Sequence, residues 1–175
     1  MPYPVLIIDY DNRWPVIYED EKHRILTVAG HKINGIDHIG STSVVGLGAK
    51  PIIDTMAGVS SSCVADELLP LLREIGYTDV SRQSGHSEWY YCLSKVINGQ
   101  EAWLQKFHLH LMKFRSETWK RHILFRDFLR NHSKTVQKYD KMKRMLAAKY
   151  GVDRESYTNA KTEFIASVIN QARLK

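Results

Sequence analysis

The sequence lacks the features that mark secreted, membrane-spanning and disulfide-stabilised proteins. Only two cysteines occur in 175 residues, and Cys63 and Cys92 form neither a close pair nor a spacing typical of a metal site. No apolar run approaches the length of a membrane span, and the first residues show no basic segment followed by an apolar core. We therefore expect a reduced, soluble, cytoplasmic protein that has no membrane partner.

Internal repeats, low-complexity tracts and linkers are also missing, so we expect one domain over residues 1–175. Hydrophobic residues at 43% and charged residues at 25% are ordinary proportions, which exclude a disordered or fibrous chain. A chain of this length buries roughly two thirds of the surface that it exposes when unfolded, so folding needs no metal or disulfide. The expected domain has a core over about 10–115 and C-terminal helices over about 116–173.

Basic residues are distributed unevenly along the chain. Residues 113–175 hold 16 Lys or Arg against 6 Asp or Glu, whereas residues 1–112 hold 9 against 13. Such a basic region can attract nucleic acid or a small anion. Its bases are spread along predicted helices, as on a solvated helix face, and few aromatic residues interleave with them. Nucleic acid is therefore the less favoured partner.

The periodicity of apolar residues predicts an α+β fold. Helices are expected at about 15–29, 62–76, 117–132, 134–150 and 155–172, and strands at about 32–39, 51–59, 77–82, 88–96 and 104–114. Asn98-Gly99 is a hairpin signal between the last two strands. This order of elements suits a mixed β-sheet with packed helices and a C-terminal helical appendage.

The first predicted helix has an apolar side and a charged side. Ile17, Ile25, Leu26 and Val28 are expected to face the core. The charged residues between positions 19 and 24, Glu21 among them, are expected mostly to face solvent.

Residues 38–54 combine glycines, hydroxyls and a lysine between two predicted strands. The glycines let the backbone approach a ligand, the hydroxyls can cap a short helix whose amides face a phosphate, and the lysine adds positive charge. These residues are Gly40, Ser41, Thr42, Ser43, Gly46, Gly48 and Lys50. The glycine, lysine and hydroxyl spacing of a P-loop is absent. A turn of this composition is equally typical of a plain connection between strands, so both interpretations stay open.

Asp54 stands in the middle of the apolar strand that follows this turn. A carboxylate in such a strand is costly to bury alone, so we expect a metal, a ligand or a basic partner beside it. Side chains alternate across a strand, which puts Asp54 and Met56 on one face and Ile53 and Thr55 on the other.

A second group of candidate ligands lies on the last predicted strand. His108 and His110 are two residues apart and therefore share a face, opposite Phe107, Leu109 and Leu111. Two imidazoles so placed can bind a metal or grip a phosphate. A histidine pair on an exposed strand face also occurs without any such role.

Five separated motifs occur in order along the chain. They are Arg13-Trp14-Pro15, His38-Ile-Gly-Ser-Thr-Ser-Val, Ala49-Lys-Pro-Ile-Ile-Asp54, His108-Leu-His110, and Trp119 with His122 and Phe125-Arg-Asp-Phe-Leu-Arg130. Together, these motifs resemble the GrpB family, which is also found as a domain appended to some bacterial dephospho-CoA kinases. Tyr157 and Lys161 fit as well. The match covers almost the whole chain. The Gly40-Ser41 turn, twelve intervening residues and Asp54 also resemble the nucleotidyltransferase superfamily signature.

The resemblance implies a nucleotidyltransferase-like fold, with the Gly-Ser turn near nucleotide phosphates and Asp54 as the catalytic residue that holds a divalent metal ion. The superfamily pattern has a second acid two residues later, where this sequence has Met56. The implied metal ligands are thus Asp54, His108 and His110, a set that favours a transition metal over magnesium. This departure weakens the case for two-metal nucleotidyl transfer.

Further residues are implied as anion contacts by the same resemblance. They are Lys50, His122, Arg126 and Arg130. Arg126 and Arg130 share a helix face and can grip one anion together, although a surface ion pair is an equal alternative for each.

The expected function is binding of a nucleotide or phosphorylated small molecule with a divalent metal, with nucleotidyl transfer as the implied reaction. The alternative is a non-catalytic module on the same fold that binds a metabolite or a partner. A second acid beside Asp54, such as Glu88, Glu101 or Glu117, would favour catalysis.

Overall fold

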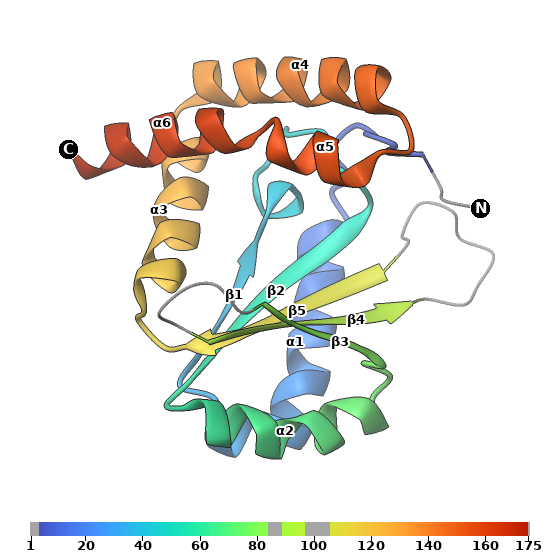
Figure 1. The fold of residues 1–175 in the computed structure, drawn as a ribbon, viewed down its shortest axis with the longest axis vertical. Helices are drawn as coiled ribbons and strands as arrows, with labels where there is room; N and C mark the ends of the chain where they lie inside the picture. Colours follow the sequence, from blue (N-terminus) through green and yellow to red (C-terminus); the bar gives the residue numbers. More distant parts are fainter. Residues whose placement is uncertain (1–3, 84–88, 97–105, 175) are drawn as a thin grey trace.

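The structure is a computed structural model that describes residues 4–83, 89–96 and 106–174 (Figure 1). Its elements in chain order are α1 (Trp14–Ala29), the 3₁₀ turn η1 (Gly30–Lys32), β1 (Gly35–Ile39), the 3₁₀ turn η2 (Ser41–Ser43), β2 (Ile52–Val59), α2 (Ser62–Glu74), β3 (Asp79–Gln83), β4 (Tyr90–Val96), β5 (Lys106–Lys113), α3 (Glu117–Asn131), α4 (Ser133–Tyr150), α5 (Arg154–Asn159) and α6 (Thr162–Arg173).

The five strands form one mixed sheet in the order β1-β2-β5-β4-β3, which confirms the predicted α+β class. Every neighbouring pair is antiparallel except β2 and β5, which run parallel. Parallel neighbours need a long crossover connection, and the segment that contains α2, β3 and β4 supplies it. In this register Asp54 lies opposite His108, and Met56 lies opposite His110.

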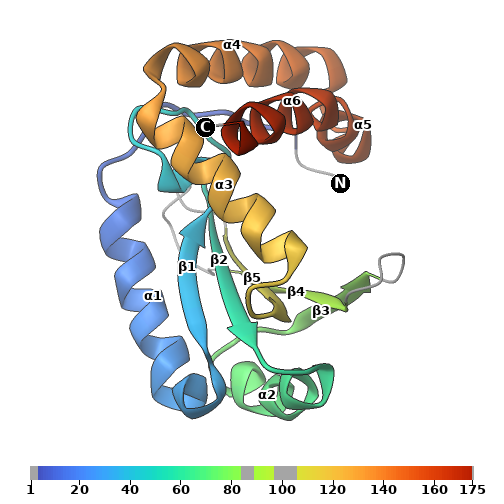
Figure 2. The same ribbon diagram turned by 90° about the vertical axis from the view of Figure 1, so that its left-hand side faces the viewer.

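The two faces of the sheet carry different layers of helices (Figure 2). Ile53 of β2 and Leu109 of β5 belong to the main core, which α1 and α2 cover. On the opposite face, Met56 and Met112 pack against Trp119 of α3 in a second cluster. Because side chains alternate along a strand, Asp54, two residues before Met56, also projects toward the α3 face.

The helices α4, α5 and α6 gather beyond one end of the sheet, with α2 at the other end, in both ribbon views. A third apolar cluster joins Val44 and Leu47 of the turn after η2 to Leu129 of α3 and Tyr139 of α4. This packing holds the segment between β1 and β2 against the C-terminal helices. No helix within the described ranges is long and apolar enough to cross a membrane.

Several predicted boundaries were wrong. The helix expected over 155–172 is two helices, separated by Ala160 and Lys161. The first strand begins at Gly35 rather than at residue 32, because residues 30–32 extend α1 as a 3₁₀ turn. The predicted Asn98-Gly99 hairpin lies outside the described residues. The other predicted helices and strands occur at nearly the expected positions.

Glu21 was expected to face solvent, but it is buried in α1, with 1% of its surface exposed. Both of its carboxylate oxygens accept hydrogen bonds from Nζ of Lys95 on β4, at 2.9 and 3.1 Å. Amphipathic periodicity places a residue on a helix face, but it does not reveal a cation on a distant strand that compensates a buried carboxylate.

We predict that Glu21→Ala lowers the free energy of unfolding by roughly 3 kcal/mol, because it leaves the largely buried Lys95 ammonium without its partner. Urea denaturation provides the measurement. Glu19→Ala is the matched control on the same helix: Glu19 pairs with Lys22 at an exposed site, and its loss is expected to cost about 0.5 kcal/mol or less. Equal losses for the two variants would contradict the assignment.

Candidate functional site

The α3 face of the sheet brings together the three residues that were predicted as metal ligands. Oδ1 of Asp54 on β2 lies 3.1 Å from Nδ1 of His108 and 3.4 Å from Nε2 of His110, both on β5. The parallel pairing of β2 with β5 creates this group, since it sets Asp54 directly beside His108.

Asp54 and His110 favour each other's charged forms. Burial opposes a charged carboxylate, but hydrogen bonds with His108 and His110 outweigh burial and lower the pKa of Asp54. Burial also favours a neutral imidazole, but Tyr90 and Asp54 outweigh it and raise the pKa of His110 well above 6.5. Tyr90 Oη is hydrogen-bonded to Nδ1 of the same ring.

Gly40 lets the turn after β1 approach the Asp54 carboxylate. Its backbone has φ 72° and ψ −174°, a region that is essentially restricted to glycine. A Cβ at this position would lie 2.4 Å from Oδ2 of Asp54 and 3.2 Å from its Cβ and Cγ. The glycine predicted from the sequence is thus required both for the turn and for space beside the carboxylate.

The three hydroxyls that follow Gly40 have different roles. Thr42 donates to the carbonyl of Ile52 at 3.2 Å, and Ser43 donates to the carbonyl of Gly40 at 2.6 Å, so both stabilise the turn. Ser41 instead accepts a hydrogen bond from Nζ of Lys143 at 2.9 Å. The short helix expected here is the three-residue η2, which is too short to form an anion site by its amides alone.

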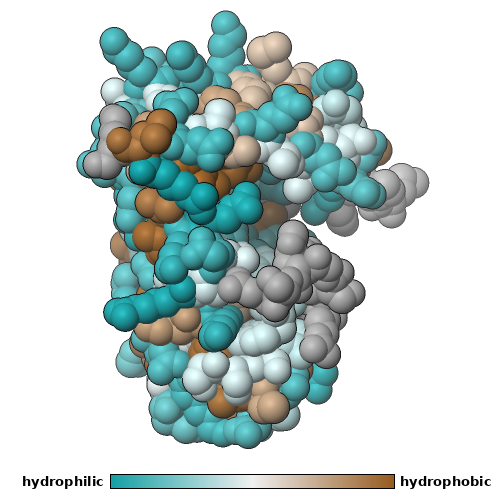
Figure 3. Space-filling model, turned by 60° about the vertical axis from the view of Figure 1, so that its left-hand side comes forward, coloured by the Kyte–Doolittle hydropathy of each residue, from teal (hydrophilic) through white to brown (hydrophobic). Residues whose placement is uncertain are grey.

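A cavity of about 490 Å³ opens beside Asp54 and this turn. Its other lining residues come mainly from α3 and from the helical layer formed by α4, α5 and α6. Figure 3 shows hydrophobic side chains around a hollow beneath the upper helices, on a face that is otherwise mostly hydrophilic. The cavity thus lies between the sheet and the helical appendage.

Three lysines line the cavity, namely Lys50, Lys143 and Lys161. Lys50 Nζ and Lys161 Nζ lie 5.4 and 4.5 Å from the ring centroid of Tyr157. Burial lowers the pKa of Lys50, lowers that of Lys143 to about 7 and lowers that of Lys161 to about 8. Within the described part of the chain, no carboxylate oxygen lies within 4.0 Å of any of the three ammonium groups.

His122, predicted as an anion contact, also lines the cavity. Burial, followed by the nearby charge of His110, lowers the pKa of His122 to about 4, so this ring is neutral at pH 7.

Arg126 and Arg130, the other predicted anion contacts, do not line this cavity. Arg126 donates to Asp37 at 2.7 Å and to Asp127 at 2.8 Å, and Arg130 donates to the carbonyl of Ser43 at 2.8 Å. Both guanidinium groups therefore hold α3 against the segment of β1 and η2.

The acids considered as partners for Asp54 do not complete a carboxylate pair in the described chain. Glu88 and Glu101 lie outside the described residues. Glu117 is exposed at the start of α3, where it pairs with Lys120 at 2.9 Å and with Arg173 at 3.6 Å. Met56 is fully buried, and Asp54 is the one acid among the described residues that line the cavity.

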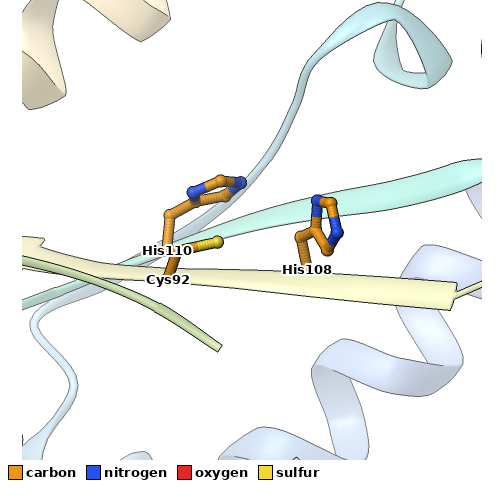
Figure 4. A group of neighbouring side chains, drawn as sticks. All are labelled: Cys92, His108 and His110. Atoms are coloured by element: carbon orange, nitrogen blue, oxygen red, sulfur yellow. The ribbon is translucent and has the colours of Figure 1, made fainter. Parts of the chain in front are cut away.

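Lys143 and Cys92 were not predicted from the sequence as site residues. Lys143 follows Val136 and Tyr139 at helical spacing on the packed face of α4, so a lysine in an apolar stripe was the available signal. Cys92 was set aside because of its sequence spacing, yet it pairs across strands with His110. Figure 4 shows Cys92 beside His108 and His110.

Comparisons with known proteins show the family and the fold of this chain. The family described as "GrpB protein" matches residues 4–171. The chain belongs to the GrpB family. A glutamate-rich protein GrpB from Alkalihalophilus pseudofirmus is 32% identical over 95% of both chains. A dephospho-CoA kinase from Mycolicibacterium paratuberculosis is 36% identical over 42% of this chain and 19% of its own length, in agreement with the predicted link to those enzymes.

Solved structures also support the fold. The crystal structure of the conserved protein GrpB from Enterococcus faecalis matches with a TM-score of 0.77 and 27% identity, over 95% of this chain and 96% of the other. The Cid1 poly(U) polymerase with bound MgGTP matches with a TM-score of 0.51 and 12% identity, over 78% of this chain and 42% of the polymerase. At that identity the second match shows only that this chain and part of Cid1 share a fold.

We predict that Gly40→Ala destabilises the protein by at least about 2 kcal/mol more than Gly46→Ala. Both glycines have positive φ, 72° and 78°, but a Cβ at Gly46 meets nothing within 4 Å. The control therefore shares the positive φ, which costs about 1–2 kcal/mol in the left-handed region, whereas Gly40 adds the contact with Asp54 and a ψ of −174° that is essentially restricted to glycine. Urea unfolding of both variants measures the difference, and equal midpoints would contradict a close approach at Gly40.

Proposed function

We propose that this GrpB protein binds a phosphorylated small molecule, with a nucleotide as the primary candidate, in the cavity beside Asp54. One observation carries the proposal: Lys50, Lys143 and Lys161 line one cavity, and no carboxylate within the described ranges pairs with them. A buried cation without a counter-ion is costly. A polyanionic ligand would supply the missing charge to all three lysines at once.

The surroundings of the lysines suit such a ligand. The rings of Tyr139 and Tyr157 lie near the ammonium groups of the three lysines. Lys143 Nζ is 4.9 Å from the Tyr139 ring centroid, and Lys50 and Lys161 lie near Tyr157. The cavity also has an apolar part, which includes Ile165 and Ile169 of α6. A ligand with both a phosphate chain and an organic group matches this division, because the phosphate can face the lysines while the organic group contacts the apolar wall.

The donor groups beside the cavity fit one transition-metal ion better than a pair of magnesium ions. Asp54, His108 and His110 offer one carboxylate and two imidazoles, whereas magnesium prefers carboxylates, phosphates and water. We propose that these three residues hold the ion. When bound, such an ion would neutralise charge on a neighbouring phosphate oxygen.

We favour a binding module over an enzyme for this site. Two-metal nucleotidyl transfer needs further carboxylates, and buried Met56 stands where the second acid would be. Nucleotidyl transfer remains the second candidate, favoured by the fold shared with Cid1, a poly(U) polymerase. If the purified protein released pyrophosphate from a nucleoside triphosphate, this result would favour nucleotidyl transfer over a binding module.

We predict that ATP binds to the protein in the presence of a divalent transition metal. Lys161→Met is expected to weaken this binding by about tenfold or more, because one charge-assisted contact contributes roughly 1.5–3 kcal/mol to the binding free energy. Asp54→Asn is expected to remove the dependence on metal. Titration calorimetry with ATP and with inorganic triphosphate, with Zn²⁺ or with a chelator, measures both effects.

Lys141→Met is the matched control for these titrations, because Lys141 is exposed on α4 and its loss removes a similar charge outside the cavity. Unchanged affinity is expected for this variant. The proposal would be wrong if wild-type protein bound neither ATP nor triphosphate under any metal condition, or if Lys141→Met and Lys161→Met had equal effects.

We also predict an unusual pH dependence of stability that originates at Lys143. Burial is the main cause that lowers the pKa of Lys143; the charge of Asp140 favours the ammonium form, and the charges of Lys161, Arg144 and Lys50 oppose it. The pKa of Lys143 is about 7 in the folded chain and about 10.4 when unfolded. Between these values the unfolded state binds more protons, so this group's contribution to stability rises with pH.

The test compares wild-type protein with Lys143→Met from pH 6 to pH 10. Relative to the variant, the wild type is expected to gain roughly 4 kcal/mol of unfolding free energy over this range, as measured by urea denaturation. Lys141→Met should run parallel to wild type. A difference between wild type and Lys143→Met that does not change with pH would show that Lys143 titrates normally.

A further inference from the structure

We propose that Cys92 is a thiolate ligand of the metal at this site, so that the centre is a sulfur-containing, zinc-type site formed by Cys92, His108, His110 and Asp54. This inference rests on the proposed metal binding and extends it, because it adds a ligand and thereby defines the class of metal. It also reverses the sequence interpretation, which excluded Cys92 from metal binding on spacing alone.

Strand pairing brings the four side chains together. Cys92 on β4 lies directly opposite His110 on β5, and His108 on β5 lies directly opposite Asp54 on β2. The four residues thus occupy three adjacent strands. Alternation along β4 puts Tyr91 and Leu93 in the main core under α1 and α2, so Cys92 projects to the other face, where Asp54 and the histidines lie.

The distances suit closure on an ion. One ligand atom each from Cys92, His108 and His110 lies within 4.8 Å of the other two. Ligands of a tetrahedral zinc, with Zn–S near 2.3 Å and Zn–N near 2.0–2.1 Å, are about 3.3–3.6 Å apart. The donors would have to approach one another by up to about 1.5 Å to reach that spacing. Asp54 is outside this three-residue group, but its Oδ1 lies 3.1 Å from Nδ1 of His108, and we propose it as the fourth ligand because of this contact.

The chemistry of the four donors selects the metal. A thiolate and two imidazoles prefer Zn²⁺ or Co²⁺ to Mg²⁺ or Ca²⁺. One thiolate and one carboxylate also balance the charge of a divalent ion, which matters at a partly buried site. Cys92, His108 and His110 are only partly buried, so an ion can reach them. Zinc can expand to five ligands, which leaves room for a phosphate oxygen from the cavity.

Cobalt substitution tests this proposal, because Co²⁺ reports directly on sulfur coordination. Metal-free protein is reduced and titrated with Co²⁺ without oxygen. Wild-type protein is expected to show a near-ultraviolet thiolate-to-cobalt charge-transfer band and intense visible bands of a tetrahedral ion, both lost on addition of Zn²⁺. Cys92→Ser is expected to lose the charge-transfer band and to bind Zn²⁺ about a hundredfold more weakly or worse.

Cys63→Ser is the matched control. Cys63 is an exposed free thiol on α2, so this variant is expected to keep the full spectrum. X-ray absorption of the zinc-loaded wild type gives a second readout that needs no variant, and one sulfur neighbour near 2.3 Å is expected. This measurement keeps the test decisive if Cys92→Ser fails to fold.

Three results would overturn the proposal: a cobalt spectrum without a charge-transfer band, a band that survives in Cys92→Ser, or the absence of sulfur around bound zinc. Metal-dependent ATP binding together with any of these results would leave the proposed function intact and remove Cys92 from the site. Failure of both metal and ATP to bind would instead overturn the proposed function as well.

Discussion

The parallel pairing of β2 with β5 is the constraint on which this molecule depends. It joins strands that are far apart in the sequence and sets Asp54 directly beside His108. The crossover between them adds β3 and β4 to the far edge of the sheet, which brings Cys92 next to His110. A one-residue change of register would turn these side chains toward the apolar core under α1 and α2.

Charged side chains around the cavity lie in two places. On the sheet, Asp54 contacts both histidines of β5. In the helical layer, Lys143 and Lys161 lie in the same cavity without a carboxylate partner in the described chain. Their pKa values of about 7 and about 8 express the cost of this burial. A structure that tolerates such a cost is typical of a binding site, because the ligand recovers the free energy.

Much of the fold followed from local patterns. Periodicity and caps predicted α1, α2, α3 and α4 to within a few residues, because apolar spacing and terminating residues act locally. The motifs around Asp54 and His108 also predicted the family and the proximity of Asp54, His108 and His110. Glu21, by contrast, was placed in solvent, since its partner Lys95 is 74 residues away along the chain.

The sequence therefore indicated the chemistry of single residues, but it did not indicate which residues would be their partners. Gly40, Asp54 and the histidine pair carry signals of their own, because positive φ, a carboxylate in an apolar strand and alternation are properties of short segments. Which thiol joins the histidines, and which of many lysines enters the cavity, depends on strand order and on how α4, α5 and α6 pack over the sheet. Those arrangements arise from long-range burial, for which a single sequence contains no local marker.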